Sequence, residues 1–258
     1  MPPRGLKKLL KDTAPCKLVG AGFKRRFEIA TPWGGRGATL KGLTKRLEAK
    51  IFSNGTFPSI ATTSTVKPLG RHWKGKGGGR RRGSAVDAQV SRLADKSPGT
   101  RYDSKMLVLT RLIFSALSEQ GLEPVAGQRA VASATHRIGT AADIVCHDST
   151  NNRLVLVELK CGFSGSKTTP CKAGGKSCTM KYPLDKASDT FLHRHLAQLC
   201  VTHTLFRREY KTLSKLKSLG IEGVDGILLY ANDDSVEVYR LPIWWQSKAS
   251  GVLDCMSA

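Results

Sequence analysis

The chain has 258 residues, of which 40% are hydrophobic, and a formal net charge of +22. Its length and apolar content suit one globular domain with an extension, and they exclude a wholly disordered chain. No apolar run approaches the roughly 20 residues of a membrane-spanning helix, and no secretory signal follows Met1, so we expect an intracellular protein that does not cross a membrane.

Residues 1–82 form a strongly basic segment, with 20 Lys or Arg against three acids and a net charge of +17. Lys and Arg side chains that neutralise phosphates release condensed counterions, so this segment favours nucleic acid as a partner, with a solubilising tail as the alternative. Four apolar residues at helical spacing predict one short helix over 39–52: Leu40, Leu43, Leu47 and Ile51. The rest is rich in Gly, Lys, Arg and Thr, and we expect a largely irregular, partly disordered extension. Six basic residues near its end are candidates for contact with nucleic acid: Arg71, Lys74, Lys76, Arg80, Arg81 and Arg82.

From Gly83 the composition becomes that of a folded domain, which we expect to span 83–250. Apolar residues at helical spacing predict helices over 86–93 and 106–117, and Gly121 is well placed to end the second. Apolar runs, turn residues and helical periodicity predict the later elements: strands over 124–132, 142–147 and 154–160, a loop over 161–182, a long helix over 188–210, and a hairpin with strands over 224–231 and 235–241. This order predicts an α/β fold with a central mixed β-sheet flanked by helices.

The hairpin predicted around residues 142–160 holds the residues best suited to chemistry. Side chains alternate along a strand, so Glu158 and Lys160 share a face. If the hairpin closes through a loop of residues 149–152, Asp143 lies opposite Glu158, with the two Cβ atoms about 5 Å apart. Paired carboxylates repel unless a cation fills the gap, and hard divalent cations prefer oxygen ligands. The pattern therefore predicts a Mg²⁺ (or Mn²⁺) site at Asp143 and Glu158, where Lys160 orients an attacking water or neutralises a phosphate. An edge hairpin whose acids face water is the alternative.

An Asp, a variable gap and Glu-x-Lys on a hairpin that follows a helix resemble the PD-(D/E)XK nuclease superfamily, within it the branch of phage lambda-type exonucleases and RecB-like nuclease domains. The likeness runs from about Gly83 to Leu241. It implies a restriction-endonuclease-like core in which Asp143 and Glu158 bind the metal and Lys160 assists hydrolysis. It also implies that the backbone carbonyl of Leu159 is a metal ligand.

Two helices extend the resemblance. Family members carry a Gln that approaches the active site from the helix after the Lys strand, which here is Gln198, although Thr202 replaces the Tyr usual four residues later. Members also begin with a helix of pattern Gly-x-x-x-His-x-x-x-Glu, in which this chain has Asp87 at the His place and Ser91 at the Glu place. The resemblance thus implies Asp87 as a further metal ligand, with Glu119 as the poorer candidate.

The loop over 161–182 adds candidate binding residues. Three of its lysines are expected to touch DNA: Lys167, Lys172 and Lys176. The same region offers zinc ligands as an alternative, although without the closely spaced pairs of most zinc sites: Cys161, Cys171 and Cys178 with His193 or His195. Since no export signal is present, we expect the seven cysteines to be reduced thiols.

The resemblance implies a Mg²⁺-dependent deoxyribonuclease, either exonuclease or endonuclease, in the replication, recombination or packaging of DNA. RNA is the alternative substrate. The expected location is the nucleus or a site of viral DNA replication, with an organelle as the alternative, and the oligomeric state stays open. A second hypothesis, favoured by the altered first helix and the positive charge, is a nucleic-acid-binding or packaging protein that keeps a nuclease fold with little catalysis.

Overall fold

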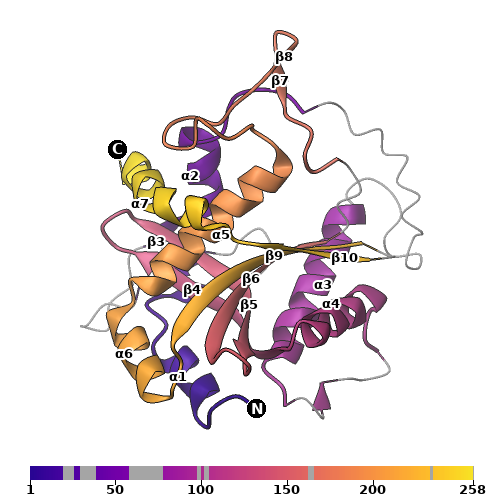
Figure 1. Cartoon of the computed structure of the whole chain (residues 1–258), viewed down its shortest axis with the longest axis vertical. Coiled ribbons are helices and arrows are strands. Elements are labelled where there is room, and N and C mark those ends of the chain that lie inside the picture. Colours follow the sequence, from indigo (N-terminus) through magenta and orange to yellow (C-terminus); the bar gives the residue numbers. More distant parts are fainter. Residues whose placement is uncertain are drawn as a thin grey trace.

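The computed structural model describes residues 1–19, 26–29, 39–57, 78–97, 100–101, 105–161, 166–232 and 235–257, with the backbone alone at 26, 78–81 and 210–211. It shows an α/β fold with helices on both faces of a large mixed sheet (Figure 1). The helices are α1 (Leu6–Asp12), α2 (Leu43–Lys50), α3 (Gly78–Ala94), α4 (Val108–Glu119), α5 (Phe191–Arg207), α6 (Tyr210–Ser218) and α7 (Ile243–Ser257). Within the described ranges, no helix is long and apolar enough to cross a membrane.

The large sheet has the strand order β1-β2-β3-β5-β6-β9-β10, and β4 also pairs with β5. Its strands are β1 (Lys17–Val19), β2 (Arg26–Glu28), β3 (Thr39–Gly42), β4 (Leu122–Ser133), β5 (Ile138–Asp148), β6 (Arg153–Cys161), β9 (Gly223–Ala231) and β10 (Val236–Arg240). The pairs β3–β5 and β6–β9 are parallel and the others antiparallel. A separate small hairpin joins β7 (Lys172–Ala173) to β8 (Lys176–Ser177).

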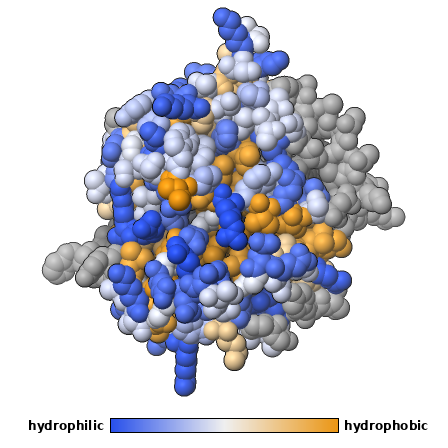
Figure 2. All heavy atoms as spheres, viewed as in Figure 1, coloured by the Kyte–Doolittle hydropathy of each residue, from blue (hydrophilic) through white to orange (hydrophobic). Residues whose placement is uncertain are grey.

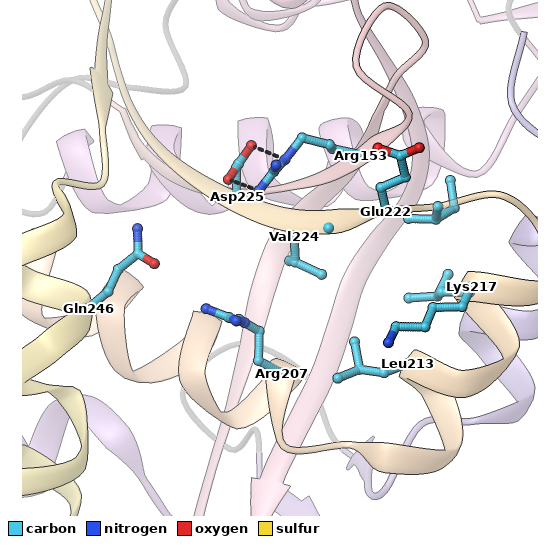
Figure 3. A pocket seen from close by; sticks show the side chains of 11 residues that line it. Arg153, Arg207, Leu213, Lys217, Glu222, Val224, Asp225 and Gln246 are labelled. Carbon is cyan, nitrogen blue, oxygen red and sulfur yellow. Dashed lines mark hydrogen bonds and ion pairs between the residues drawn. The ribbon is translucent and has the colours of Figure 1, made fainter.

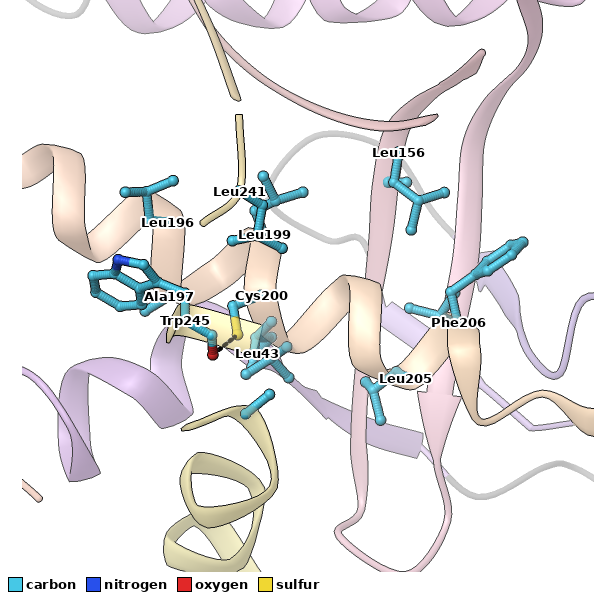
Figure 4. Packing of buried hydrophobic residues seen from close by; sticks show 14 of the residues in the cluster. Leu43, Leu156, Leu196, Ala197, Leu199, Cys200, Leu205, Phe206, Leu241 and Trp245 are labelled. Carbon is cyan, nitrogen blue, oxygen red and sulfur yellow. Dashed lines mark hydrogen bonds between the residues drawn. The ribbon is translucent and has the colours of Figure 1, made fainter. Parts of the chain in front are cut away.

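The central strands are apolar on both faces because helices cover both. In β6, Leu154 and Leu156 belong to a cluster with residues of α1, α2, α5 and α7, whereas Val155 and Val157 pack with α3 and α4. Figure 4 shows the first cluster, in which apolar side chains of α5 gather with Leu156, Leu43 and Trp245. The two-residue alternation along β6 therefore decides which helices each side chain meets, and Glu158 and Lys160 follow Leu156 on the α5 side.

The predicted order of helices and strands from residue 83 onward is confirmed, with three differences. The segment expected as a loop over 161–182 contains the short hairpin of β7 and β8. The long helix expected over 188–210 ends at Arg207, and α6 begins a new helix at Tyr210. The Thr190 hydroxyl caps the start of α5 by accepting a hydrogen bond from the His193 N–H at 3.1 Å. Helix α7 had no sequence prediction, although its buried residues recur at helical spacing: Trp245, Ala249, Val252, Leu253 and Met256.

The expectation of a largely irregular extension over 1–82 is wrong for its described parts. The region expected as one helix over 39–52 splits into β3, which joins the sheet, and α2. Leu6 and Leu10 of α1 and Leu47 of α2 are fully buried in the main core. The basic composition of this segment led to the expectation of disorder, because its apolar residues are few. Their burial nevertheless offsets the entropy lost when a short helix becomes ordered. The boundary expected at Gly83 also falls inside α3, while 58–77 lies outside the described residues.

Candidate active site

Asp143 lies where β5 and β6 separate. The antiparallel ladder between these strands ends at the pair Ile144 and Val157. This register confirms the one predicted from a loop of residues 149–152, and continued by one residue it would set Asp143 opposite Glu158. Asp143 instead accepts a hydrogen bond on Oδ2 from the N–H of Leu159 at 2.7 Å. The carboxylate of β5 is thereby fixed beside the Glu-x-Lys segment of β6.

Glu158, Lys160 and Gln198 meet on the α5 side of the sheet. Lys160 Nζ donates to Glu158 Oε1 at 2.5 Å and to Gln198 Oε1 at 3.4 Å. Glu158 is only 2% exposed, and its second oxygen, Oε2, is buried with no hydrogen-bond partner among the described residues. A buried carboxylate oxygen without a partner is costly, so this atom is suited to a cation that arrives from outside the chain.

The acids at this point repel one another. Burial raises the pKa of Asp143 well above its ordinary value, Glu158 raises it further, and Lys160 opposes both effects. Burial also raises the pKa of Glu158 against the opposing attraction of Lys160. Burial alone would lower the pKa of Lys160, but the attraction of Glu158 and Asp143 prevails and raises it. One ammonium thus faces two carboxyls whose ionised forms are unfavourable, an electrostatic imbalance that a divalent cation would correct.

Gln128 connects the first helix to this cluster. Its Nε2 donates to Asp87 Oδ1 of α3 at 2.7 Å and to Asp143 Oδ1 at 3.4 Å. The register of β4 on β5 sets Gln128 opposite Asp143, between the flanking pairs of the ladder. Its φ of 50° is one that residues other than glycine rarely adopt, a kind of strain that gathers at functional sites. Sequence reasoning missed Gln128, since its position depends on a register shift between Pro124 and Ala126.

Three further side chains surround the cluster, and none was assigned to it from the sequence. His195 Nδ1 and the Tyr230 hydroxyl share a hydrogen bond of 2.6 Å, and Tyr230 pairs with Lys160 between β6 and β9. Burial, then Lys160 and Arg194, lower the pKa of His195 to about 2, so its ring is neutral at ordinary pH. Burial, then Asp143 and Asp87, raise the pKa of the Cys161 thiol to about 12. These groups add no positive charge to the acids.

The residues fit a cation held by few protein ligands. In the part of the chain that the structure describes, no three His, Cys, Asp or Glu side chains converge on a point suited to a metal ion. The available oxygens are the Asp143 and Glu158 carboxylates, including the buried Oε2 of Glu158. Mg²⁺ typically binds one or two carboxylates, keeps several waters and completes its shell with substrate phosphate oxygens. This pair suits such an ion better than one that needs a full protein cage.

The residues of the zinc alternative lie in different parts of the structure. Cys171 and Cys178 contact each other at the β7–β8 hairpin, whereas Cys161 lies near Asp143 at the end of β6. His195 is engaged with Tyr230. The fold therefore does not gather Cys161 and His195 around the pair Cys171 and Cys178.

The predicted nucleic-acid contacts fall into different environments. Arg82 is not accessible for the predicted contact with nucleic acid, because the residue is only 3% exposed. It stands one helical turn before the buried Val86 on α3. Lys167 pairs with Glu237, and its Nζ lies 5.0 Å from the centre of the Tyr230 ring. Arg71, Lys74 and Lys76 lie outside the described ranges. Arg80 and Arg81 lie in α3 and are described by their backbone alone.

Lys172 and Lys176 are exposed on the β7–β8 hairpin, as a contact with DNA requires. The hairpin projects from the end of the molecule where α5 begins (Figure 1). Figure 2 shows hydrophilic side chains over this projection and over most of the same face. These two lysines are therefore the predicted contacts that the structure leaves accessible.

A pocket of about 360 Å³ lies away from the acids, at the other end of β6 and β9 (Figure 3). Arg153, the first residue of β6, forms an ion pair with Asp225 at its rim, with Nε and Oδ2 2.7 Å apart. Arg207 of α5 and Lys217 of α6 line it as well. Lys160 stands seven residues further along β6, which corresponds to roughly 20 Å. The pocket is therefore separate from the candidate active site.

The raised carboxyl pKa values predict how stability depends on pH. Without metal, the contribution of Asp143 and Glu158 to the free energy of unfolding should fall as pH rises, because their protonated forms favour the folded state. Their contribution is fully present below the ordinary carboxyl pKa and is lost as pH passes the raised folded values. Asp143→Asn mimics the protonated form, so it should flatten this dependence and raise the unfolding temperature at neutral pH.

Thermal unfolding followed by circular dichroism, in chelator and over a pH series, measures this effect. Asp148→Asn is the matched control on the same hairpin. Burial raises the pKa of Asp148, but hydrogen bonds from Asn151 and Thr150 outweigh it and lower the pKa. Its loss should therefore reduce stability at neutral pH. An unchanged pH slope in Asp143→Asn would contradict the expected repulsion.

Comparison with known proteins adds no relative, since neither protein-family models nor curated protein sequences match this chain.

Proposed function

We propose that this protein is a metal-dependent nuclease that hydrolyses phosphodiester bonds of DNA, with a restriction-endonuclease-like core of the PD-(D/E)XK type. The observation that carries the proposal is the meeting of Asp143, Glu158 and Lys160 where β5 and β6 separate. The orphaned Oε2 of Glu158 and the raised pKa of Asp143 both favour a bound cation at this point. An edge hairpin whose acids face water would produce neither feature.

The chain's own side chains have distinct tasks in this proposal. Asp143 and Glu158 would hold Mg²⁺ or Mn²⁺, together with the carbonyl of Leu159. When bound, the metal would supply an activated water and offset the charge that develops on the phosphate. Lys160 has its Nζ beside Glu158 and is oriented by Gln198, so it can direct a water or donate to a phosphate oxygen. Asp87 would act through Gln128 as a more distant acid.

The positive net charge of the protein favours the approach of DNA to this acidic site. The net charge of +22 favours long-range attraction of a polyanion. Lys172 and Lys176 are exposed on the β7–β8 hairpin, which projects near the first residues of α5 (Figure 1). Contacts of this kind hold the phosphate backbone without reading base sequence. We therefore propose a nuclease with little sequence preference.

The direct test is a cleavage assay with linear and closed circular DNA, in Mg²⁺ or in chelator. Wild-type protein should cut only with the metal, and Asp143→Ala should bind DNA without cutting it. Cutting of linear DNA alone indicates an exonuclease, and cutting of both forms an endonuclease. A parallel reaction with RNA decides the substrate class. Wild-type protein that binds but never cuts would overturn the proposal.

The second candidate function is a DNA-binding or packaging protein that keeps the fold with little catalysis. The observations in its favour are the altered first helix, whose Asp87 accepts a hydrogen bond from Gln128, and the net charge of +22. In this case Asp87, held by Gln128, has no part in metal binding. Binding of DNA by the wild type without metal-dependent cleavage would support this function.

Gln128 offers a test of how the acids are held. Gln128→Gly accepts the backbone φ of 50° but removes the amide that joins Asp87 to Asp143. We expect the Mg²⁺ concentration for half-maximal cleavage to rise by roughly 10–100-fold, the usual cost of losing a residue that orients a metal ligand. Titration of cleavage rate against Mg²⁺ measures this shift.

Arg137→Gly is the matched control for Gln128→Gly. Arg137 has a φ of 51° and lies in the exposed turn between β4 and β5. The substitution Arg137→Gly should relieve the same kind of backbone strain and leave the Mg²⁺ concentration for half-maximal cleavage unchanged. Equal effects of the two variants would mean that the Gln128 amide has no role at the acids.

A further inference from the structure

We infer that Cys171 and Cys178 are a site of reversible disulfide formation across the β7–β8 hairpin. The hairpin turns through Gly174 and Gly175, whose φ values of 55° and 79° suit a tight two-residue turn. The two cysteines stand directly outside its strands, where the N–H of Cys178 donates to the carbonyl of Cys171 at 2.9 Å. They are therefore directly opposed residues of one antiparallel pair.

The two sulfur atoms lie side by side. A Cβ atom placed on Gly55 would lie 2.7 Å from Cys178 Sγ and 2.9 Å from Cys171 Sγ, so both sulfurs surround the same point. Hydrogen-bonded antiparallel pairs have Cα atoms about 5.5 Å apart, within the range that disulfides span. The bond can form without moving the strands apart.

The thiols differ in access, which gives the reaction an order. Cys171 is fully buried and shares a hydrogen bond of 3.0 Å with the Ser53 hydroxyl. Burial raises the pKa of its thiol. Cys178 is half-buried, on the projecting hairpin. A small-molecule oxidant thus meets Cys178 first, and Cys171 is the thiol that resolves the adduct.

The reaction is a pair of thiol–disulfide exchanges with a disulfide such as oxidised glutathione. Cys178 loses its proton to solvent, and its thiolate attacks one glutathione sulfur. The glutathione disulfide bond breaks, and one glutathione thiolate leaves and takes up a proton. Cys171 then loses its proton to solvent and attacks the Cys178 sulfur, which releases the second glutathione thiolate. Two protein thiols are oxidised, and one small disulfide is reduced to two thiols.

The disulfide would fix the base of the segment that carries Lys172 and Lys176. It would also lie against the chain around Gly55, where Thr56 and Lys172 exchange two backbone hydrogen bonds of 2.9 Å. The site depends only on the hairpin, so it stands or falls independently of the proposed nuclease activity.

The test uses the full-length protein and two lysine cleavage sites inside the hairpin. The protein is incubated with oxidised glutathione, its remaining thiols are blocked with N-ethylmaleimide, and it is digested with trypsin. Cleavage after Lys172 and Lys176 separates the cysteines onto peptides 168–172 and 177–181. We expect these peptides to be recovered as one linked species, lighter than the two thiol peptides together by two hydrogens. Dithiothreitol should separate them.

Two variants serve as controls. Cys178→Ser should abolish the linked species, and Cys255→Ser, at another half-buried cysteine, should leave it unchanged. Recovery of the two peptides as separate maleimide or glutathione adducts, while other thiols oxidise, would overturn the inference. So would a bound metal ion, found by elemental analysis, that protects both thiols. Equal pairing with all other cysteines would show random oxidation and would overturn it as well.

Discussion

Glu158→Gln is expected to lower the rate of Mg²⁺-dependent DNA cleavage by about a thousand-fold, on the scale of losing one preorganised group at a transition state. The substitution keeps the shape of the side chain but removes the anionic oxygens, including the buried Oε2 that has no partner among the described residues. Because an amide avoids the cost of a buried charge, the variant should fold at least as stably as the wild type. Single-turnover cleavage and thermal unfolding measure the two effects.

Glu222→Gln is the control for this change. Glu222 is exposed just before β9, at the far end of the sheet from Glu158. The same loss of one carboxylate there should leave cleavage unchanged. Lys160→Met should lower the rate by roughly a hundred- to a thousand-fold while Mg²⁺ still binds. A Glu158→Gln enzyme as fast as the wild type would remove the acid cluster from the mechanism.

Leu47→Ala is expected to lower the free energy of unfolding by about 2–5 kcal/mol. Leu47 is fully buried in the core cluster that also contains side chains of α5 and α7, so the change removes apolar contacts and leaves a cavity. Denaturation with urea, followed by circular dichroism, measures the loss. An irregular N-terminal extension would lose nothing from this substitution.

Lys45→Ala is the matched control on the same helix, because Lys45 is exposed. Its effect should stay within about 0.5 kcal/mol. Removal of residues 1–57 should prevent stable folding, because it takes away α1, α2 and β3 together. A truncated protein that unfolds at the wild-type urea concentration would restore the interpretation of these residues as a separate extension.

The hairpin that carries the candidate active site could be predicted from local pattern. The two-residue alternation places Glu158 and Lys160 on one face, and the turn residues after Asp148 determine the register with β5. Asp143 follows from that register, since its partner lies only 15 residues away in the sequence. Short-range rules suffice here because the contacts involved are themselves short-range.

The first helix and Gln198 required the family resemblance as well as the pattern. Helical periodicity places Asp87 on α3 and Gln198 on α5, but it does not orient either helix on the sheet. The structure brings Gln198 to Lys160, and hydrogen bonds of Gln128 join Asp87 to Asp143. Packing of the two apolar clusters on opposite faces of the sheet makes that choice.

The sequence by itself determined the α/β order, the β5–β6 register and the group formed by Asp143, Glu158 and Lys160. Only the tertiary structure decided that the basic N-terminal segment enters the core, that Gln128 lies opposite Asp143 and that Arg82 is buried. It also decided that Cys171 and Cys178 meet beside Gly55. The physical reason is range: alternation and turn chemistry act between near neighbours, whereas burial depends on surfaces contributed by residues far apart in the chain.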